Sequence, residues 1–214
     1  MKTQSGSSHV SALLLILVVF CGIGVFCFLN LGKWLIVSNS PADPVNVLFT
    51  FAGENARITY SKQLFRKNPN ALWIISYPSS KIKAALSRDN LDTSRIRVID
   101  TCTDTKAEVA CIIQWQRSHG KLLASRSAPG RTPVIGLVSS WYHMRRIKLL
   151  LESRAISEPH AVRFFPVQQN DSTTEKPENI WWKNETTRNI VVSEWGKTIF
   201  IYINKTYKQA FKQA

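Results

Sequence analysis

The pattern of apolar and polar positions divides the chain into an apolar N-terminal stretch and a longer part in which strand-like and helix-like segments alternate. Residues 10–31 are almost wholly apolar, and no Asp, Glu, Lys or Arg occurs between Thr3 and Gly32. A helix of this length can cross a hydrocarbon core about 30 Å thick. We therefore expect residues 1–9 to be a short tail, residues 10–31 a transmembrane signal-anchor helix and residues 32–44 a juxtamembrane linker.

A cleaved signal peptide is the alternative interpretation of the apolar stretch. The apolar region of a signal peptide spans only about 7–15 residues and ends at a site of small residues. Ser40 and Ala42 would suit late cleavage, but the length of the apolar run favours an uncleaved anchor. Lys2 and the α-amino group precede the anchor, whereas Lys33 and Asp43 follow it. The positive-inside rule then favours a cytoplasmic N-terminus and an extracytoplasmic main domain on the inner (plasma) membrane.

Residues 45–214 alternate between uninterrupted apolar runs and segments with helical spacing. Such runs are typical of strands buried on both faces, and their alternation with helices is typical of a parallel sheet covered by helices. We predict an α/β domain, a three-layer Rossmann-like domain with a mainly parallel sheet, preceded by one transmembrane helix. The predicted strands are 45–51, 71–76, 96–99, 134–138 and 162–167, and the predicted helices are 56–67, 81–90, 105–119, 141–151 and 189–207.

The charge and the cysteines narrow the choice of partners. The net charge is +14, from 28 basic and 14 acidic residues. In an anchored chain this excess favours anionic lipid headgroups or phosphorylated molecules over nucleic acid, with a solubilising surface as the alternative. Cys102 and Cys111 lie on either side of a predicted helix start, and we expect them to be too far apart to bridge. No CxxC or HxxxH spacing occurs, so no metal site is predicted.

The most informative segment is the loop after the fourth predicted strand, because ligands of such folds bind beyond the carboxyl ends of the strands. Ser139 and Ser140 precede a helix start that carries His143 and Arg146. A helix start offers unpaired N–H groups to a phosphate, His143 suits proton transfer near neutral pH, and Arg146 can clamp phosphate. Arg57, after the first strand, would reach back over the same edge. The alternative is a capped helix and a plain turn with exposed basic side chains.

The loop after the third predicted strand supplies the acidic candidates. Asp100, Thr103 and Asp104 would line the cleft, with Glu108 as an acid or base within it. Thr105 and Glu108 also have the Thr-x-x-Glu spacing of a capping box, which is a sufficient structural reason for both residues. The spacing alone favours this structural explanation.

With these loops laid out, the chain resembles the YdcF–SanA–ElyC family of bacterial proteins. Residues 139–146 (Ser-Ser-Trp-Tyr-His-Met-Arg-Arg) resemble the family signature Thr-Ser-x-x-His-Met-x-Arg. Residues 102–105 (Cys-Thr-Asp-Thr), with Glu108, resemble a second signature, Ser-Thr-Asn-Thr followed by acidic or amide residues. Arg57 stands where the family usually has an arginine, and residues 194–197 (Glu-x-x-Lys) resemble its closing segment. Glycine-rich loops usual in the family read Phe-Ala-Gly-Glu and Ser-Tyr-Pro-Ser here.

The resemblance implies an anchored envelope protein that takes part in cell-envelope or cell-wall biogenesis and barrier function. It implies binding, and possible hydrolysis or transfer, of a phosphorylated lipid carrier such as undecaprenyl phosphate. A nucleotide- or S-adenosylmethionine-binding module and a non-catalytic membrane scaffold are the alternatives. The candidate catalytic residues are His143, Glu108 and Asp100. The candidate ligand-binding residues are Arg57, Thr103, Asp104, Thr105, Ser139, Ser140 and Arg146.

Overall fold

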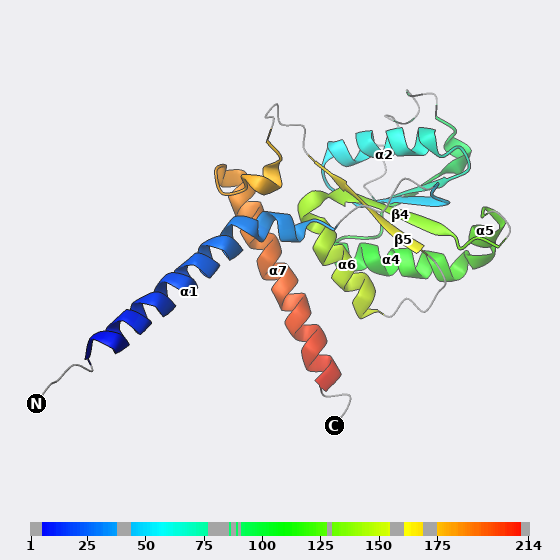
Figure 1. Ribbon diagram of the computed structural model, residues 1–214. Helices are drawn as coiled ribbons and strands as arrows, with labels where there is room; N and C mark the ends of the chain where they lie inside the picture. The colour runs from blue at the N-terminus through cyan, green and yellow to red at the C-terminus, as the bar shows by residue number, and fades with distance from the viewer. Residues whose placement is uncertain are drawn as a thin grey trace, which may run out of the picture.

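Within the part of the chain that the structure describes, five parallel strands form one sheet between helices (Figure 1). The computed structural model describes residues 6–37, 44–76, 86, 89, 91–127, 130–154, 161–168 and 175–210. The spatial order is β3-β2-β1-β4-β5. This α/β arrangement, with a long apolar helix in front of it, confirms the predicted fold class. The strands are β1 (Val47–Thr50), β2 (Leu72–Ser76), β3 (Ile96–Ile99), β4 (Val134–Ser140) and β5 (Ala161–Val167).

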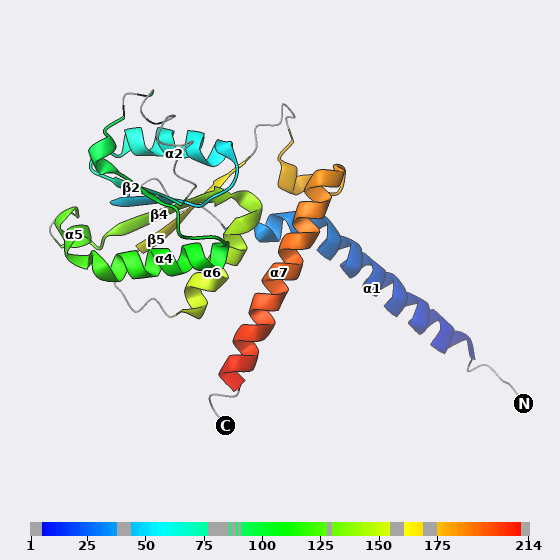
Figure 2. The same cartoon turned by 180° about the vertical axis from the view of Figure 1, so that it is seen from behind.

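Helices cover both faces of the sheet because the central strands are apolar on both sides. Every residue of β1 and β2 is buried. On one face Leu48 and Trp73 pack with Ile58 and Phe65 of α2, and the opposite face is covered by α4 and α6 (Figures 1 and 2). The helices named so far are α2 (Asn55–Lys67), α4 (Thr105–Ser118) and α6 (Met144–Ser153).

The strand order reverses between β1 and β4, the neighbours at the centre of the sheet. Val47 pairs with Leu72 of β2 on one side and with Ile135 of β4 on the other. The chain segments that leave β1 and β4 therefore diverge to opposite faces at the carboxyl edge. This is where open parallel sheets bind their ligands.

The N-terminal helix α1 (Gly6–Leu35) docks its last turns on the domain. Its span Ser11–Leu35 is long and apolar enough to cross a membrane, with a mean hydropathy of 3.1 and 0% of the window buried. Leu35 is fully buried in a cluster with Trp141 and Trp181. A Cβ on Gly32 would lie 2.5 Å from the Glu178 carbonyl oxygen, so glycine allows this close approach. Helix α1 thus continues four residues past the predicted span, and its last turns pack against the domain.

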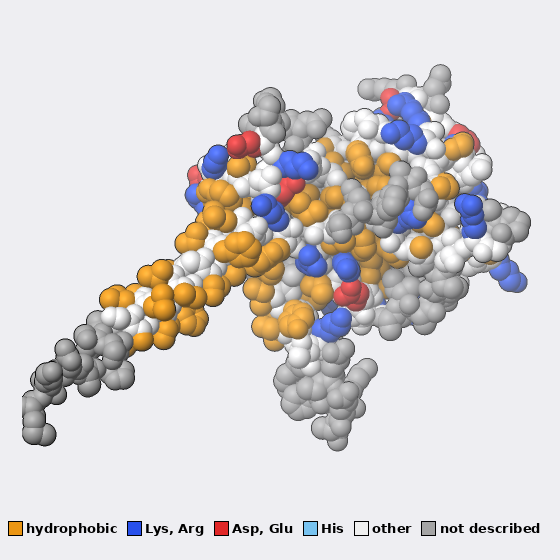
Figure 3. Space-filling view, viewed as in Figure 1, with side chains coloured by type: hydrophobic (Ala, Val, Ile, Leu, Met, Phe, Trp, Pro, Cys, Tyr) orange, Lys and Arg blue, Asp and Glu red, His pale blue; other side chains and the backbone are white. Residues whose placement is uncertain are grey.

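The last helix, α7 (Glu185–Ala210), begins beside α1 and then diverges from it (Figure 1). The Trp195 indole donates to the Leu31 carbonyl at 2.9 Å, which ties the two helices together. Farther along, Ile199, Phe200 and Ile203 are exposed. Apolar side chains follow α1 and the adjoining part of α7 (Figure 3).

The remaining differences from the predicted elements are local. The predicted helix 105–119 ends at Ser118 and is followed by a short helix, α5 (Gly120–Ser125). The predicted helix 81–90 lies outside the described residues, apart from Leu86 and Asp89. The described residues also form the 3-10 turns η1 (Thr93–Arg95), η2 (Trp141–His143) and η3 (Pro177–Asn179).

Candidate functional site

A hydrogen-bonded network joins the segments that follow β1 and β4. The Arg57 Nε donates to the Ser140 hydroxyl at 3.0 Å, and that hydroxyl donates to Glu54 Oε2 at 2.8 Å. The Tyr142 hydroxyl donates to Glu54 Oε1, and Arg57 Nη1 donates to the Ala52 carbonyl. Burial raises the pKa of Tyr142, so its hydroxyl keeps the proton that it donates. The network holds the two loops of the switch point together.

Arg57 is an internal residue of this network. Its side chain is only 3% exposed, and its guanidinium is directed at carbonyls and at Ser140. Gly53 has a φ of +136°, and a Cβ there would lie 2.7 Å from the guanidinium, so glycine makes room for it. The alternative of an exposed Arg57 is wrong, because residues of the loops after β1 and β4 surround it, and its role in holding a ligand stays a prediction.

A second cluster forms where η2 and α6 meet α7. The Glu194 carboxylate accepts from Arg146 Nε at 2.8 Å and from Lys197 Nζ at 2.8 Å, and its side chain is 3% exposed. The His143 Nδ1 lies 2.7 Å from Arg146 Nη2 and 3.1 Å from Glu194 Oε2. The structure therefore brings the predicted residues His143 and Arg146 together around an acid from the far end of the chain.

The protonation state of His143 decides which neighbour its Nδ1 engages. Burial lowers the pKa of His143 more than Glu194 raises it, so the imidazole is neutral at pH 7. Arg146 always carries its protons, so neutral His143 accepts at Nδ1 and bears its own proton on Nε2. In acid, Nδ1–H faces Glu194 instead. Burial alone would raise the pKa of Glu194, but His143, Lys197 and Arg146 lower it to about 2.

Two cavities flank this cluster and share Lys197. The first, which we call the His143 cavity, has a volume of about 490 Å³. The second, the α4–α7 cavity, has a volume of about 510 Å³ and lies between the start of α4, α6 and α7. The His143 cavity is lined by Tyr142, His143, Thr186, Asn189, Ile190, Ser193, Glu194 and Lys197. The α4–α7 cavity is lined by Asp104, Thr105, Lys106, Arg146, Leu150, Gly196, Lys197, Phe200 and Ile201.

The start of α4 differs from the predicted capping box. Asp104, not Thr105, is the N-cap, and its carboxylate accepts from the Ala107 N–H at 2.7 Å. Glu108 is buried and accepts from the Ala52 N–H at 2.6 Å, across the edge of the sheet. The capping-box prediction is therefore wrong. Asp and Thr are both good N-caps, and the choice between adjacent residues depends on the path of the loop. The hydrogen bond from Ala52 to Glu108 couples α4 to the loop after β1, and burial raises the pKa of Glu108.

The other predicted residues are more scattered. Asp104 and Thr105 share the α4–α7 cavity with Arg146. Asp100 and Thr103 are exposed on the loop after β3, whereas Ser139 is 1% exposed at the end of β4. Among the described residues, no three His, Cys, Asp or Glu side chains converge in a way that could hold a metal ion. Asp100, Asp104, Glu108 and His143, which could hold one if their loops converged, do not form such a group.

The expectation that Cys102 and Cys111 are too far apart to bridge is wrong. They form a disulfide, with Cα atoms 6.8 Å apart. The loop after β3 turns back along the first turns of α4, which places Cys102 beside a residue nine positions later. This bridge ties down the segment that carries Asp104.

Sequence reasoning missed three residues that organise the site, namely Glu54, Tyr142 and Glu194. Glu194 is the last acid of the chain and is followed three residues later by Lys197. That isolation within a basic C-terminal region could have singled it out. Nothing local marks Glu54, whose partners lie 86 and 88 positions away.

Comparison of the chain with protein-family models, with curated proteins and with solved structures finds no match. The class of protein is therefore defined from the fold and the site alone. The chain is a doubly wound α/β domain with a candidate membrane-spanning helix and with paired charges at its carboxyl edge.

Proposed function

We propose that the chain is a membrane-anchored protein of the YdcF–SanA–ElyC type that binds a phosphorylated lipid at the carboxyl edge of its sheet. Its role would lie in cell-envelope or cell-wall biogenesis. The observation that carries the proposal is the composition of the α4–α7 cavity. The basic residues Lys106, Arg146 and Lys197 are among its lining residues, together with the apolar residues Leu150 and Phe200. A lipid phosphate has the same two parts, an anionic head and an apolar chain.

The cationic part of the cavity suits a phosphate. Lys106, Arg146 and Lys197 face one lining acid, Asp104, whose carboxylate caps α4. Glu194 orients Arg146 through Nε and Nη2 lies against His143, so Nη1 is the guanidinium nitrogen that can donate to a phosphate oxygen. The first turn of α4 adds the positive end of its dipole to these side chains. An anion is therefore favoured over a neutral ligand.

The apolar part favours a lipid over free phosphate. Leu150, Phe200 and Ile201 line the cavity, and Phe200 is 68% exposed. Ile199 and Ile203 on the same helix are also exposed, and α7 begins beside the candidate transmembrane helix. Apolar surface of this extent favours contact with an apolar partner. An acyl or prenyl chain could follow α7 from the cavity towards the membrane.

His143 lines the neighbouring His143 cavity, so it would act on a ligand that extends past Lys197, which lines both cavities. Its Nδ1 is engaged by Arg146, so Nε2 is the nitrogen left for a ligand in the His143 cavity. The neutral imidazole can donate a hydrogen bond from Nε2 to a phosphate oxygen. In a hydrolysis or transfer reaction His143 would act as a general acid only in its protonated form, because the neutral ring does not give up its Nε2 proton. Glu108 and Asp100 contribute less, because one is bonded to the backbone and the other lies on an exposed loop.

The disulfide supports an extracytoplasmic position for the α/β domain. Disulfides persist in oxidising compartments and are rare in the cytosol of most organisms. Cys102 and Cys111 are bonded, and Cys21 and Cys27, in the anchor helix, are free. The charge bias around the anchor favours the same orientation.

The test measures binding of undecaprenyl phosphate to the full chain in detergent micelles, with undecaprenol as the phosphate-free control. We expect the phosphate to bind and undecaprenol to bind at least about tenfold more weakly, a difference of about 1.4 kcal/mol. Lys106→Gln and Arg146→Gln should each weaken binding by a similar factor. Lys106 is exposed, so its variant tests the site without disturbing the core.

Arg117→Gln is the matched control, because it removes an equal charge from an exposed position on the same helix as Lys106. Equal weakening by Lys106→Gln and Arg117→Gln would reduce the effect to general attraction by a basic surface. That result, or equal binding of undecaprenol, would overturn the proposal. Retained binding with loss of turnover in His143→Ala would assign a catalytic role to the imidazole.

A further inference from the structure

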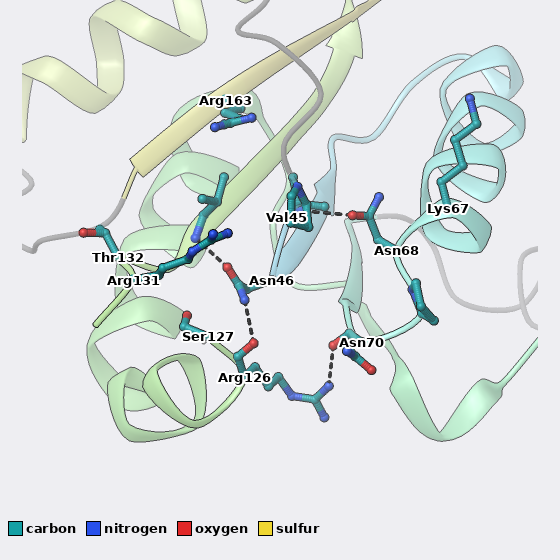
Figure 4. A pocket seen from close by; sticks show the side chains of 13 residues that line it. Val45, Asn46, Lys67, Asn68, Asn70, Arg126, Ser127, Arg131, Thr132 and Arg163 are labelled. Carbon is teal, nitrogen blue, oxygen red and sulfur yellow. Dashed lines mark hydrogen bonds between the residues drawn. The ribbon is translucent and has the colours of Figure 1, made fainter. Parts of the chain in front are cut away.

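A separate cavity of about 600 Å³ opens at the amino-terminal edge of the sheet, the edge opposite His143 (Figure 4). We call it the amino-edge cavity. It lies near α5, on the side of the domain that faces away from α1 (Figure 1). Its described lining residues are Pro44, Val45, Asn46, Lys67, Asn68, Pro69, Asn70, Arg126, Ser127, Arg131, Thr132, Val134 and Arg163.

The charges around the amino-edge cavity all have one sign. Lys67, Arg126, Arg131 and Arg163 line it, and the described lining includes no Asp or Glu. Lys67 is the last residue of α2 and Arg126 directly follows α5, and cations at helix ends complement the helix dipole. Arg131 has no such explanation, because it precedes β4. Positive charges gathered around one hollow repel one another, and an anion bound there would relieve that repulsion.

The walls of the cavity are held in place by amide side chains. Asn46 accepts from the Val134 N–H at 2.8 Å and donates to the Arg126 carbonyl at 2.7 Å. Asn68 accepts from the Val45 N–H at 3.0 Å. Arg126 donates from Nη1 to the Asn70 carbonyl at 2.8 Å (Figure 4). Its Nε is buried without a partner among the described residues. The cavity is therefore preformed, and one of its donors is unsatisfied.

We propose that the amino-edge cavity binds a small soluble polyphosphate, a molecule that carries a pyrophosphate or longer phosphate group. A volume of about 600 Å³ suits a ligand of small-molecule size. Lys67, Arg126 and Arg131 together match several phosphate charges better than a single monoanion, and guanidinium groups bind phosphate oxygens in pairs. The cavity faces away from the anchor helix, which favours a soluble ligand over a lipid headgroup. This site is independent of the phosphorylated-lipid site at the other edge.

The test is a calorimetric titration of the full chain in detergent micelles with inorganic pyrophosphate and tripolyphosphate at constant ionic strength. The variant Lys67→Gln/Arg131→Gln removes two exposed cations that make no hydrogen bond or ion pair with another described residue. The control Arg117→Gln/Lys121→Gln removes two exposed cations from α4 and α5, outside the cavity. We expect pyrophosphate to bind the wild type, the cavity variant to bind it at least about tenfold more weakly, and the control to match the wild type within about twofold.

Three outcomes would overturn the proposal. Absence of pyrophosphate binding to the wild type would leave the cavity without its ligand. Equal weakening in the two double variants would show attraction by overall charge. Weakening by Arg146→Gln, without weakening by Lys67→Gln/Arg131→Gln, would place the bound pyrophosphate at the carboxyl edge. Melting temperatures measured without ligand establish that each variant is folded.

Discussion

Charged side chains gather at both edges of the sheet, but among the described lining residues they are paired with opposite charges only at the carboxyl edge. At the carboxyl edge, Glu194 binds Arg146 and Lys197, and Glu54 accepts from Ser140 and Tyr142. At the amino edge, four cations line a cavity without a lining acid among the described residues. Paired charges fix side-chain geometry before a ligand arrives, whereas unbalanced charges leave repulsion for a ligand to relieve. The carboxyl edge thus holds its side chains in a fixed orientation, and the amino edge attracts an anion.

The largest loss of unfolding free energy is expected when Glu194→Ala breaks the ion pairs of the carboxyl edge. Removing one member of a buried ion pair leaves its partners uncompensated and typically costs about 3–5 kcal/mol. Arg146 and Lys197 would both lose their shared carboxylate, and His143 would lose its neighbour. Denaturant unfolding of the full chain in micelles measures the loss. A loss below about 1 kcal/mol would mean that the cluster does not organise this edge.

A smaller loss of unfolding free energy is expected when the disulfide is removed. Closing a loop of about ten residues lowers the entropy of the unfolded chain and is worth about 2–3 kcal/mol. Cys102→Ser/Cys111→Ser should lose roughly that amount and should weaken binding of undecaprenyl phosphate, since the bridge holds the segment that carries Asp104. Cys21→Ser/Cys27→Ser is the matched control, because those thiols are free. Equal unfolding free energies for the two double variants would argue against a bridge.

The network at the switch point is tested by Gly53→Ala. The positive φ of Gly53 and the Arg57 guanidinium 2.7 Å from the added Cβ both oppose the substitution. We expect a loss of about 1–3 kcal/mol in unfolding free energy. Gly130→Ala is the control, since Gly130 also has a positive φ but meets nothing within 4 Å. If the two variants are equally stable, contact with Arg57 contributes nothing beyond backbone strain.

The paired edge also predicts the pH dependence of stability. His143 and Glu194 both have pKa values lowered by folding, so the unfolded chain binds more protons and stability rises with pH. Protonation of His143 lowers the unfolding free energy as pH falls below about 6.5, and protonation of Glu194 lowers it further between about pH 4.5 and 2. Glu194→Gln should flatten the unfolding free energy below pH 4.5, as measured by urea titrations at several pH values. A slope that does not change would contradict the assigned pKa of Glu194.

The smallest change in unfolding free energy is expected from a substitution at the amino edge. Arg131→Gln removes an exposed cation and should change the ligand-free stability by no more than about 0.5 kcal/mol. We expect a small gain in stability, because the substitution relieves repulsion between Arg131 and the other cations of the cavity. Thermal unfolding without added phosphate measures it against Arg117→Gln. A loss above about 1 kcal/mol would mean that Arg131 has a structural partner.

Strand positions could be predicted from sequence because a strand buried on both faces is mostly apolar, as residues 47–49 and 71–75 are. The site could be predicted only where its residues are local. His143 and Arg146 share one turn of sequence, whereas Glu194 reaches them across about fifty positions. The burial of Arg57 depends on the carbonyls that surround it, which no local pattern reveals.

The most direct test is a crossed titration of undecaprenyl phosphate and pyrophosphate against one double variant from each edge. Lys106→Gln/Arg146→Gln alters the carboxyl edge, and Lys67→Gln/Arg131→Gln alters the amino edge. We expect the first variant to lose the lipid and keep pyrophosphate, and the second to show the reverse. A variant that loses both ligands equally, or a pair of variants that lose neither, would contradict the division of the molecule into two anion sites.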